Sequence, residues 1–233
     1  MKQLQNPLLL KFDGKIADIV YLTPTVKQYT IEIPKGFSFI PGQFVSIVLN
    51  NGEQFKRSYS IASTVNNKKL ELCIKILENG KGTQILDKCK SGDVLKMQGP
   101  MGRFVIQEKS WEKDLYLIAT GTGITPFRPM IPYLLENDFQ NRIHLVVGYK
   151  TEDELLYHDE LIALEKKHPN LKYISVFSRD SNHDSEHVQD KLTNVPKDAH
   201  YYVCGIKEMV MDVREILALQ KVPVENIFFE RYS

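Results

Sequence analysis

The chain has 233 residues, of which 42% are hydrophobic and 25% are charged; these ordinary globular values exclude the disordered and fibrous classes. Its 30 Lys and Arg residues against 29 Asp and Glu leave a net charge of +1, so we expect no nucleic-acid partner. No apolar run is long enough to cross a bilayer, and residues 1–15 carry no signal-peptide cleavage pattern, so we expect no membrane association. The three cysteines, Cys73, Cys89 and Cys204, are far apart. That spacing favours a reducing cytoplasm and excludes an iron–sulfur cluster held within the chain by four clustered cysteines.

Residues 15–106 show the alternation typical of short β-strands separated by turns. Six segments carry it: KIADIVYL, VKQYTIEI, QFVSIVL, FKRSYSIAS, LELCIKI and DVLKMQG. The stretch 80–88 interrupts them and predicts a short helix, with Thr83 as its cap. The pattern predicts a small antiparallel β-barrel or sandwich.

From residue 114 onwards, apolar strands alternate with helices. The expected strands are LYLIAT, IHLVVGY, LKYISVF, AHYYVCG and NIFFERY, and the expected helices are FRPMIPYLLEN, EDELLYHDELIALEKKH and IKEMVMDVREILALQ. Pro132 should kink the first of these helices or delay its regular part. The alternation indicates a parallel sheet. We therefore predict an antiparallel β-barrel domain at 1–106, a polar linker at 107–113 and an α/β nucleotide-binding domain at 114–233.

The run Arg57-Ser58-Tyr59-Ser60 combines a cation, a phenol ring and hydroxyls on one predicted strand. Arg57 and Tyr59 share a face because strand side chains alternate. A guanidinium can clamp a phosphate, and a ring beside it can stack on a planar heterocycle. An ordinary half-exposed strand with one surface Arg is the alternative.

Two glycine-bearing turns are further candidate anion sites. Gly80-x-Gly82-Thr83 begins the short helix, and Gly121-Thr122-Gly123-Ile124-Thr125-Pro126 follows the strand LYLIAT. The second turn lacks the third glycine of the usual dinucleotide fingerprint, so a plain strand-to-helix turn remains an equal alternative. Together with Arg57, the first turn supplies two phosphate-directed features for one diphosphate.

Several polar residues follow the later strands. Ser178 and Arg179 are candidates for binding the 2′-phosphate of NADP, with a surface turn as the alternative. Cys204 and Gly205 end another strand, where a buried structural thiol is the alternative to a place beside nicotinamide. The pair His183 and His187 has metal-ligand spacing but no defined third ligand, so we expect no metal site.

Taken in order, the motifs resemble the ferredoxin–NADP reductase family of flavoproteins, with its flavin-reductase and oxygenase-reductase branches. The resemblance covers nearly the whole chain and is carried by PGQF, RSYSIAS, GKGT, GPMGRF, GTGITP, VCGIKEM and the terminal FERYS. It departs from the family where Glu186-His187-Val188 stands in place of a common Gly-Arg pair, and where Ser233 follows Tyr232.

The resemblance implies roles for individual residues. Arg57, Ser58 and Tyr59 look like flavin contacts, with Tyr59 on the isoalloxazine ring and Ser60 near flavin N5, where hydride arrives. The turn Gly80-Lys81-Gly82-Thr83 resembles the second pyrophosphate contact. The implied pyridine-dinucleotide loop is formed by Gly121, Thr122, Gly123 and Thr125, with Cys204 and Gly205 bordering nicotinamide. Glu230 and Tyr232 resemble the family's terminal carboxylate and aromatic ring, in which the ring covers the flavin until nicotinamide displaces it. The candidate catalytic residues are therefore Ser60, Cys204, Glu230 and Tyr232.

We therefore expect an enzyme that passes hydride from NADPH or NADH to FAD, rather than FMN, and then single electrons to a separate acceptor. Ferredoxin, flavodoxin or an oxygenase component is the expected partner, and Lys81, Lys88, Lys90 and Lys96 are expected to form a docking patch for it. A reductase of free flavin and a non-catalytic electron-transfer subunit remain alternatives.

Overall fold

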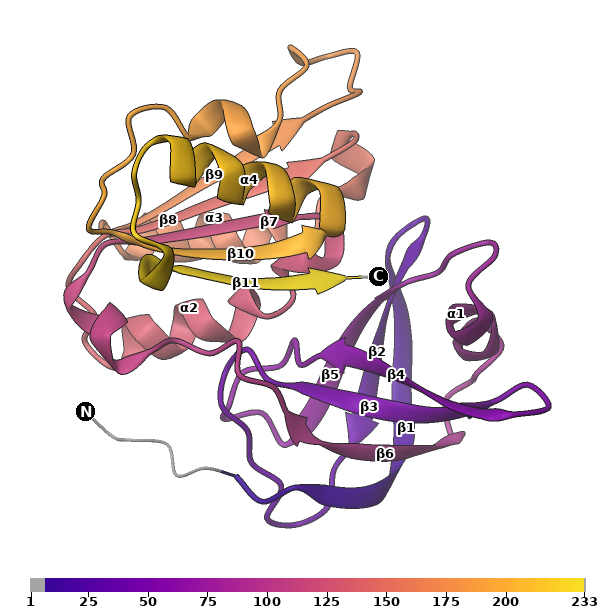
Figure 1. Ribbon diagram of the computed structural model, residues 1–233. Helices are drawn as coiled ribbons and strands as arrows, with labels where there is room; N and C mark the ends of the chain where they lie inside the picture. The colour runs from indigo at the N-terminus through magenta and orange to yellow at the C-terminus, as the bar shows by residue number, and fades with distance from the viewer. Residues whose placement is uncertain (1–6, 233) are drawn as a thin grey trace. The chain divides into compact units, whose positions relative to one another are not determined.

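The computed structural model of the chain describes residues 7–232 (Figure 1). Contacts between Cα atoms divide it into two compact units, which are described separately. Among the described residues, the barrel unit comprises 7–105 and 125–137, and the sheet unit comprises 106–124 and 138–232. No helix among the described residues is long and apolar enough to cross a membrane.

The barrel unit is built on six antiparallel strands in the order β4-β3-β6-β1-β2-β5. A bridge between Ile61 and Leu72 joins the two ends of this order and closes the barrel. Buried residues alternate along β6, so its inward side chains join a core that includes Tyr29, Ile47 and Leu86. The strands are β1 (Leu10–Thr23), β2 (Val26–Glu32), β3 (Phe44–Asn50), β4 (Gln54–Ser60), β5 (Lys69–Lys75) and β6 (Val94–Met101). The expected barrel is confirmed, with a first strand longer than its alternation suggested.

Two helices belong to the barrel unit. Helix α1 (Lys81–Asp87) buries Leu86 in the barrel core, where the Tyr29 hydroxyl donates to the Leu86 carbonyl at 2.8 Å. Helix α2 (Phe127–Glu136) buries Phe127 and Met130. The expected delay at Pro132 is wrong, because the helix is already regular from Phe127 and continues through that proline.

The sheet unit holds five parallel strands in the order β11-β10-β7-β8-β9. Figure 1 shows α4 in front of this sheet and α3 behind it. Met209, Val210 and Val213 of α4 pack on one apolar face of the strands. The elements are β7 (Leu115–Thr120), β8 (Ile143–Tyr149), α3 (His158–Lys167), β9 (Leu171–Phe177), β10 (His200–Ile206), α4 (Lys207–Leu219) and β11 (Ile227–Tyr232). The expected parallel sheet is confirmed.

The single helix expected over 152–168 is wrong. The structure has a short 3₁₀ helix at Glu152–Glu154, and α3 begins only at His158. Between them Leu156 is buried, and its backbone amide and carbonyl both lie 3.4 Å from the Tyr149 hydroxyl. Tyr157 then adopts a left-handed conformation with φ of 57°. Burial of Leu156 against the sheet therefore interrupts a sequence that is helical by its local pattern.

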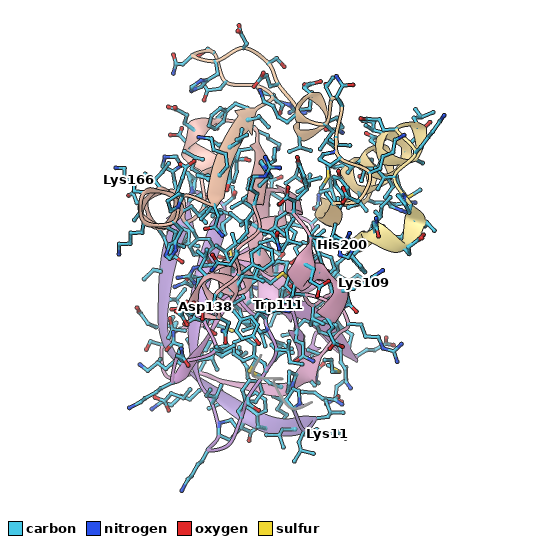
Figure 2. The ribbon with its side chains drawn as sticks, turned by 90° about the vertical axis from the view of Figure 1, so that its left-hand side faces the viewer. Lys11, Lys109, Trp111, Asp138, Lys166 and His200 are labelled. Atoms are coloured by element: carbon cyan, nitrogen blue, oxygen red, sulfur yellow. The ribbon has the colours of Figure 1, made fainter. Side chains whose placement is uncertain are left out.

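The expected linker 107–113 contains a 3₁₀ helix, Glu108–Glu112, that reaches the buried amino end of β10. The Ser110 hydroxyl lies 2.7 Å from His200 Nδ1 and 2.7 Å from the Tyr202 hydroxyl. Figure 2 shows Lys109 close to His200 at this end of the unit. Burial of His200, followed by the charge of Lys109, lowers the pKa of the imidazole.

Candidate functional site

Strand β4 places the Arg57 and Tyr59 side chains at alternate positions, as the sequence predicts. Arg57 is exposed, whereas Tyr59 is half-buried against the barrel core. Burial raises the pKa of Tyr59 to about 12, so the ring is a neutral phenol at physiological pH. Ser60 ends the strand and is 5% exposed. The Ser58 hydroxyl lies 3.0 Å from that of Ser46 on the neighbouring strand β3.

The Arg57 guanidinium is held in place but has no carboxylate partner among residues 7–232. Its Nη1 donates to the Lys56 carbonyl at 2.9 Å, and its Cζ lies 4.8 Å from the centre of the Phe55 ring. Arg57 takes part in none of the ion pairs of the described chain. A cation with fixed position and free charge is suited to a phosphate.

The turn that begins α1 lies against Arg57. A Cβ atom on Gly82 would stand 2.9 Å from Arg57 Cγ and 3.2 Å from Leu49 Cδ1, so a side chain there would displace the arginine stem. The structure thus brings together Arg57 and the Gly80–Thr83 turn, which are more than twenty residues apart in sequence. These residues fit a flavin diphosphate, since the stem of Arg57, whose guanidinium has no carboxylate partner among residues 7–232, packs on a turn that has no side chain at Gly82.

The expectation that Thr83 caps α1 is wrong. Gly80 is the N-cap residue, and no side chain supplies a capping hydrogen bond there. The Thr83 hydroxyl instead accepts from the Leu77 amide at 3.1 Å and donates towards the carbonyls of Leu77 and Gly80. It therefore fixes the approach to the turn rather than the helix end.

In the sheet unit, the strand order changes direction at the first strand, β7. The chain passes from β7 to β8 on one side and later returns to β10 on the other. In open parallel sheets ligands bind outside the carboxyl ends of the strands at such a switch point. The segment Gly121–Ile124 lies there as a short 3₁₀ helix, and the regular helix α2 starts only at Phe127, after Pro126 as its N-cap.

Gly123 packs directly on the end of β10. A Cβ atom there would overlap the Cys204 carbonyl oxygen and stand 2.9 Å from Gly205 Cα. A Cβ atom on Gly205 would in turn meet the Thr120 hydroxyl. The glycines of the two predicted motifs are therefore needed for the close packing of the loop on the strand end. Thr122 and Thr125 belong to the same segment, and Thr125 is 1% exposed.

Thr120 is a candidate site residue that the sequence analysis did not include. Its Oγ1 is the buried side-chain polar atom that lacks a hydrogen-bond partner within residues 7–232. An orphaned hydroxyl at the switch point fits a site completed by a polar ligand. The signal in the sequence, a Thr at the last position of LYLIAT, is too common to identify it.

The carboxyl ends of β10 and β11 bring Cys204, Glu230 and Tyr232 together. Cys204 is opposite Glu230 in the strand register, and Ile206 is opposite Tyr232. Burial raises the pKa of the Cys204 thiol, and the Glu230 carboxylate raises it further, against a smaller opposing effect of the hydrogen bond with Tyr232. The thiol therefore stays protonated at neutral pH, which argues against a role as nucleophile. Ser233 lies outside the described residues.

Ser178 and Arg179 lie just past the end of β9. Their amides donate to the carbonyls of Tyr149 and Lys150 at 3.0 and 2.9 Å, which extends the pairing of β8 and β9. Arg179 is exposed and does not pair with Asp180, whose carboxylate accepts from the amides of Glu152 and Asn182. These two hydrogen bonds lower the pKa of Asp180.

A cavity of about 410 Å³ opens beside this strand end. His183 lines it, stacked on Phe177 with ring centres 4.6 Å apart, and its Nε2 lies 2.8 Å from Glu152 Oε1. His187 does not join His183, because its side chain forms a capping box with Asp190. The lining residues are Glu152, Leu155, His158, Ser175, Val176, Phe177, His183, Asp184 and Glu186.

Comparison with known proteins matches both units. The family model of the oxidoreductase FAD-binding domain matches residues 13–106, and that of the oxidoreductase NAD-binding domain matches residues 117–215. Ferredoxin--NADP reductase B of Sorangium cellulosum is 30% identical, over 95% of this chain and 98% of that protein. The toluate 1,2-dioxygenase electron transfer component of Pseudomonas putida is 28% identical over 84% of this chain, which spans 59% of that protein.

Solved structures share the fold. A ferredoxin NADP+ reductase from Neisseria gonorrhoeae with bound FAD and NADP superposes with a TM-score of 0.85 at 21% identity. The overlap covers 95% of this chain and 98% of that one.

Proposed function

This chain belongs to the ferredoxin–NADP reductase family, and we propose that it is an FAD-dependent NAD(P)H oxidoreductase that delivers electrons to a separate acceptor. When bound, FAD supplies the means to accept a hydride and release electrons one at a time. We assign flavin binding to residues 1–106 and pyridine-nucleotide binding to residues 114–233. The observation that carries the flavin assignment is the packing of the Arg57 stem on Gly82, which brings an arginine with no carboxylate partner among residues 7–232 to the turn that begins α1.

In the barrel unit, Arg57 would hold the flavin diphosphate together with the turn Gly80, Gly82 and Thr83. Tyr59 would offer its neutral ring face to the isoalloxazine, and Ser60 would hydrogen-bond near the atom that receives hydride. Ser58 would contribute its backbone, since its hydroxyl already pairs with that of Ser46.

In the sheet unit, Gly121, Thr122 and Gly123 would bind the dinucleotide, and the orphaned Thr120 hydroxyl would gain a partner. Thr125, the residue at which the chain enters the barrel unit, would complete this set of contacts. Cys204 and Gly205 would border the nicotinamide, with Glu230 and Tyr232 beside them. The role of Cys204 would be one of shape, because its protonated thiol is a small apolar group.

Ser178 and Arg179 are our candidates for contact with the 2′-phosphate of NADPH. Support comes from the exposed guanidinium of Arg179 at the end of a parallel strand, which takes part in no ion pair among residues 7–232. The ratio of kcat/KM for NADPH to that for NADH should fall in Arg179→Ala. An unchanged ratio would make Arg179 an ordinary surface residue.

The proposed acceptor is a ferredoxin, a flavodoxin or an oxygenase component, in keeping with the names of the two relatives. Exposed Lys81 begins α1, Lys88 is its C-cap residue and Lys90 follows, which gives an acidic carrier a basic surface. Lys96 instead lies on β6, in a cross-strand row with Val48 and Lys56. We therefore restrict the proposed docking patch to Lys81, Lys88 and Lys90.

The proposed location is the cytoplasm. None of the three cysteines forms a disulfide within the described structure, which is in keeping with a reducing compartment.

The function is tested by following oxidation of NADPH or NADH by the purified protein, with a ferredoxin as electron acceptor and no added flavin. The account expects turnover that depends on the carrier and falls as salt rises, and that Lys88→Glu with Lys90→Glu slows it. Lys166→Glu on α3, labelled in Figure 2, is the matched control and should be neutral. Turnover that requires added free flavin would support a flavin reductase instead.

A further inference from the structure

Helix α2 is fastened to the barrel by Arg128, the second residue of the helix. Arg128 Nη1 donates to Glu71 Oε2 at 2.6 Å and to the Ala62 carbonyl at 3.1 Å. The two side chains are 15% and 17% exposed, against 70% and 23% in the surface pair Arg142–Asp114. The Arg128 contact is therefore shielded from water and salt, where charge-assisted hydrogen bonds are strongest.

Arg128 contacts the barrel next to the bridge that closes it. The Ala62 amide donates to the Glu71 carbonyl at 2.8 Å, and the adjacent residues Ile61 and Leu72 form the closing bridge. Ala62 is only two residues past Ser60, the end of β4. The arginine thus holds the chain that directly follows the proposed flavin-binding strand.

The other end of this connection is the proposed nucleotide loop. Gly121–Ile124 belongs to the sheet unit, and the chain enters the barrel unit at Thr125, two residues before α2 begins. If the first turn of α2 shifts, Thr125 and Pro126 are therefore the two residues whose backbone can change to keep the loop in place. Thr125 is 1% exposed and Pro126 has a fixed φ, so these two residues have little conformational freedom to compensate for such a shift.

Stability of the helix does not explain an arginine at this position. A cation in the first turn opposes the helix dipole, which favours acidic residues there. The apolar side of α2 is already buried through Phe127, Met130 and Leu134. Apolar packing is non-directional, however, whereas guanidinium hydrogen bonds fix both distance and orientation. What Arg128 adds is a defined position for the first turn of α2.

We propose that Arg128 is a positioning residue for hydride transfer, which acts by holding the end of the nucleotide loop to the barrel through Glu71 and Ala62. The inference rests on the proposed function. Arg128 acts through α2 and needs no contact with either reactant. Its loss is expected to lower the rate of the chemical step more than the affinity for nucleotide.

The test compares Arg128→Ala, Arg128→Lys and Glu71→Gln with wild type in the flavin-loaded protein. The limiting rate of flavin reduction by NADPH and NADH is measured by stopped flow, with the nucleotide Kd taken from the same titration. Arg128→Ala should lower the limiting rate about ten- to hundredfold, the scale expected for a small misplacement of reacting groups. Arg128→Lys should recover part of the rate, and Glu71→Gln should lose less than Arg128→Ala. Arg142→Ala, which removes an exposed ion pair of the sheet unit, is the matched control and should behave as wild type.

A second readout needs no flavin. Amide hydrogen exchange over residues 121–131 of the apoprotein should be faster in Arg128→Ala than in wild type, and near wild type in Arg142→Ala. If Arg128→Ala does not fold, Arg128→Lys and Glu71→Gln decide the question by the same two measurements.

A variant with a lowered Tm but a wild-type rate of flavin reduction would show that Arg128 is structural only and would overturn the proposal. Unchanged amide exchange over 121–131 in Arg128→Ala would also overturn it. If wild-type protein oxidises neither nucleotide, the proposed function fails, and amide exchange alone still decides whether Arg128 holds the loop.

Discussion

Replacement of Arg57 by Ala should weaken FAD binding without unfolding the barrel. The guanidinium is exposed and makes one hydrogen bond, to the carbonyl of its neighbour Lys56, so its removal costs the folded barrel little. A hydrogen bond to a charged group contributes roughly 1.5–3 kcal/mol, which corresponds to a loss of affinity of about 10- to 150-fold. Arg57→Lys keeps the charge but not the planar guanidinium, so its affinity for FAD should lie between those of wild type and Arg57→Ala.

The assay is titration of apoprotein with FAD, followed by quenching of flavin fluorescence and repeated at several salt concentrations. Lys56→Ala is the matched control, because Lys56 is an exposed cation on the same strand whose amine bonds Gln98 at 2.8 Å. It should bind FAD as wild type does. An Arg57→Ala protein that binds FAD within about twofold of wild type would refute the phosphate role, since it leaves less than 0.5 kcal/mol for the contact.

Three further outcomes are expected. Ser60→Ala should retain FAD but lower the stopped-flow rate of flavin reduction about tenfold or more, the scale of one lost hydrogen bond in the reacting geometry; a wild-type rate would remove the role of its hydroxyl. Gly123→Ala should weaken binding of NADPH and NADH while leaving FAD affinity intact, because the new methyl group would overlap the Cys204 carbonyl, and unchanged nucleotide affinity by calorimetry would contradict this. The pKa of His200 is lowered in the folded chain, so above its ordinary value of 6.5 the imidazole is neutral in both the folded and the unfolded chain. Below that pH the unfolded chain binds a proton at this histidine, which lowers the free energy of unfolding. The midpoint of urea unfolding should therefore decrease as the pH is lowered from 7.5 to 5.5, and it should decrease less in His200→Gln. Equal decreases in the two proteins would exclude this histidine as the cause.

Local pattern was enough to predict most of the elements. The apolar runs LYLIAT, IHLVVGY and LKYISVF coincide with β7, β8 and β9, because strands buried on both faces leave an uninterrupted apolar signal. The break before α3 was not predictable in this way. It depends on Leu156 reaching the Tyr149 hydroxyl, a contact made only after the sheet has formed.

The residues of the candidate site also differ in whether the local sequence predicts them. Arg57 and the glycine turns can be proposed from the sequence because a cation and a ring on one strand, and glycines before a helix, are local patterns. Thr83 was misassigned because its hydroxyl finds the Leu77 backbone, six residues earlier, instead of the helix end. Thr120 and Arg128 are not predictable from the sequence. Thr120 matters because its hydroxyl lacks a hydrogen-bond partner within residues 7–232, and Arg128 matters because its partner Glu71 is distant in sequence. Neither property is written in the local sequence.

One chain is proposed both to bind FAD and to reduce it with a pyridine nucleotide. The most direct test is the visible absorbance spectrum of the purified protein during anaerobic titration with NADPH and then NADH, followed by identification of the released flavin. We expect a flavin spectrum before titration, bleaching that is complete near one equivalent of the preferred nucleotide, and FAD as the released flavin. A protein that carries no flavin and takes up none, or a bound flavin that neither nucleotide bleaches, would contradict it.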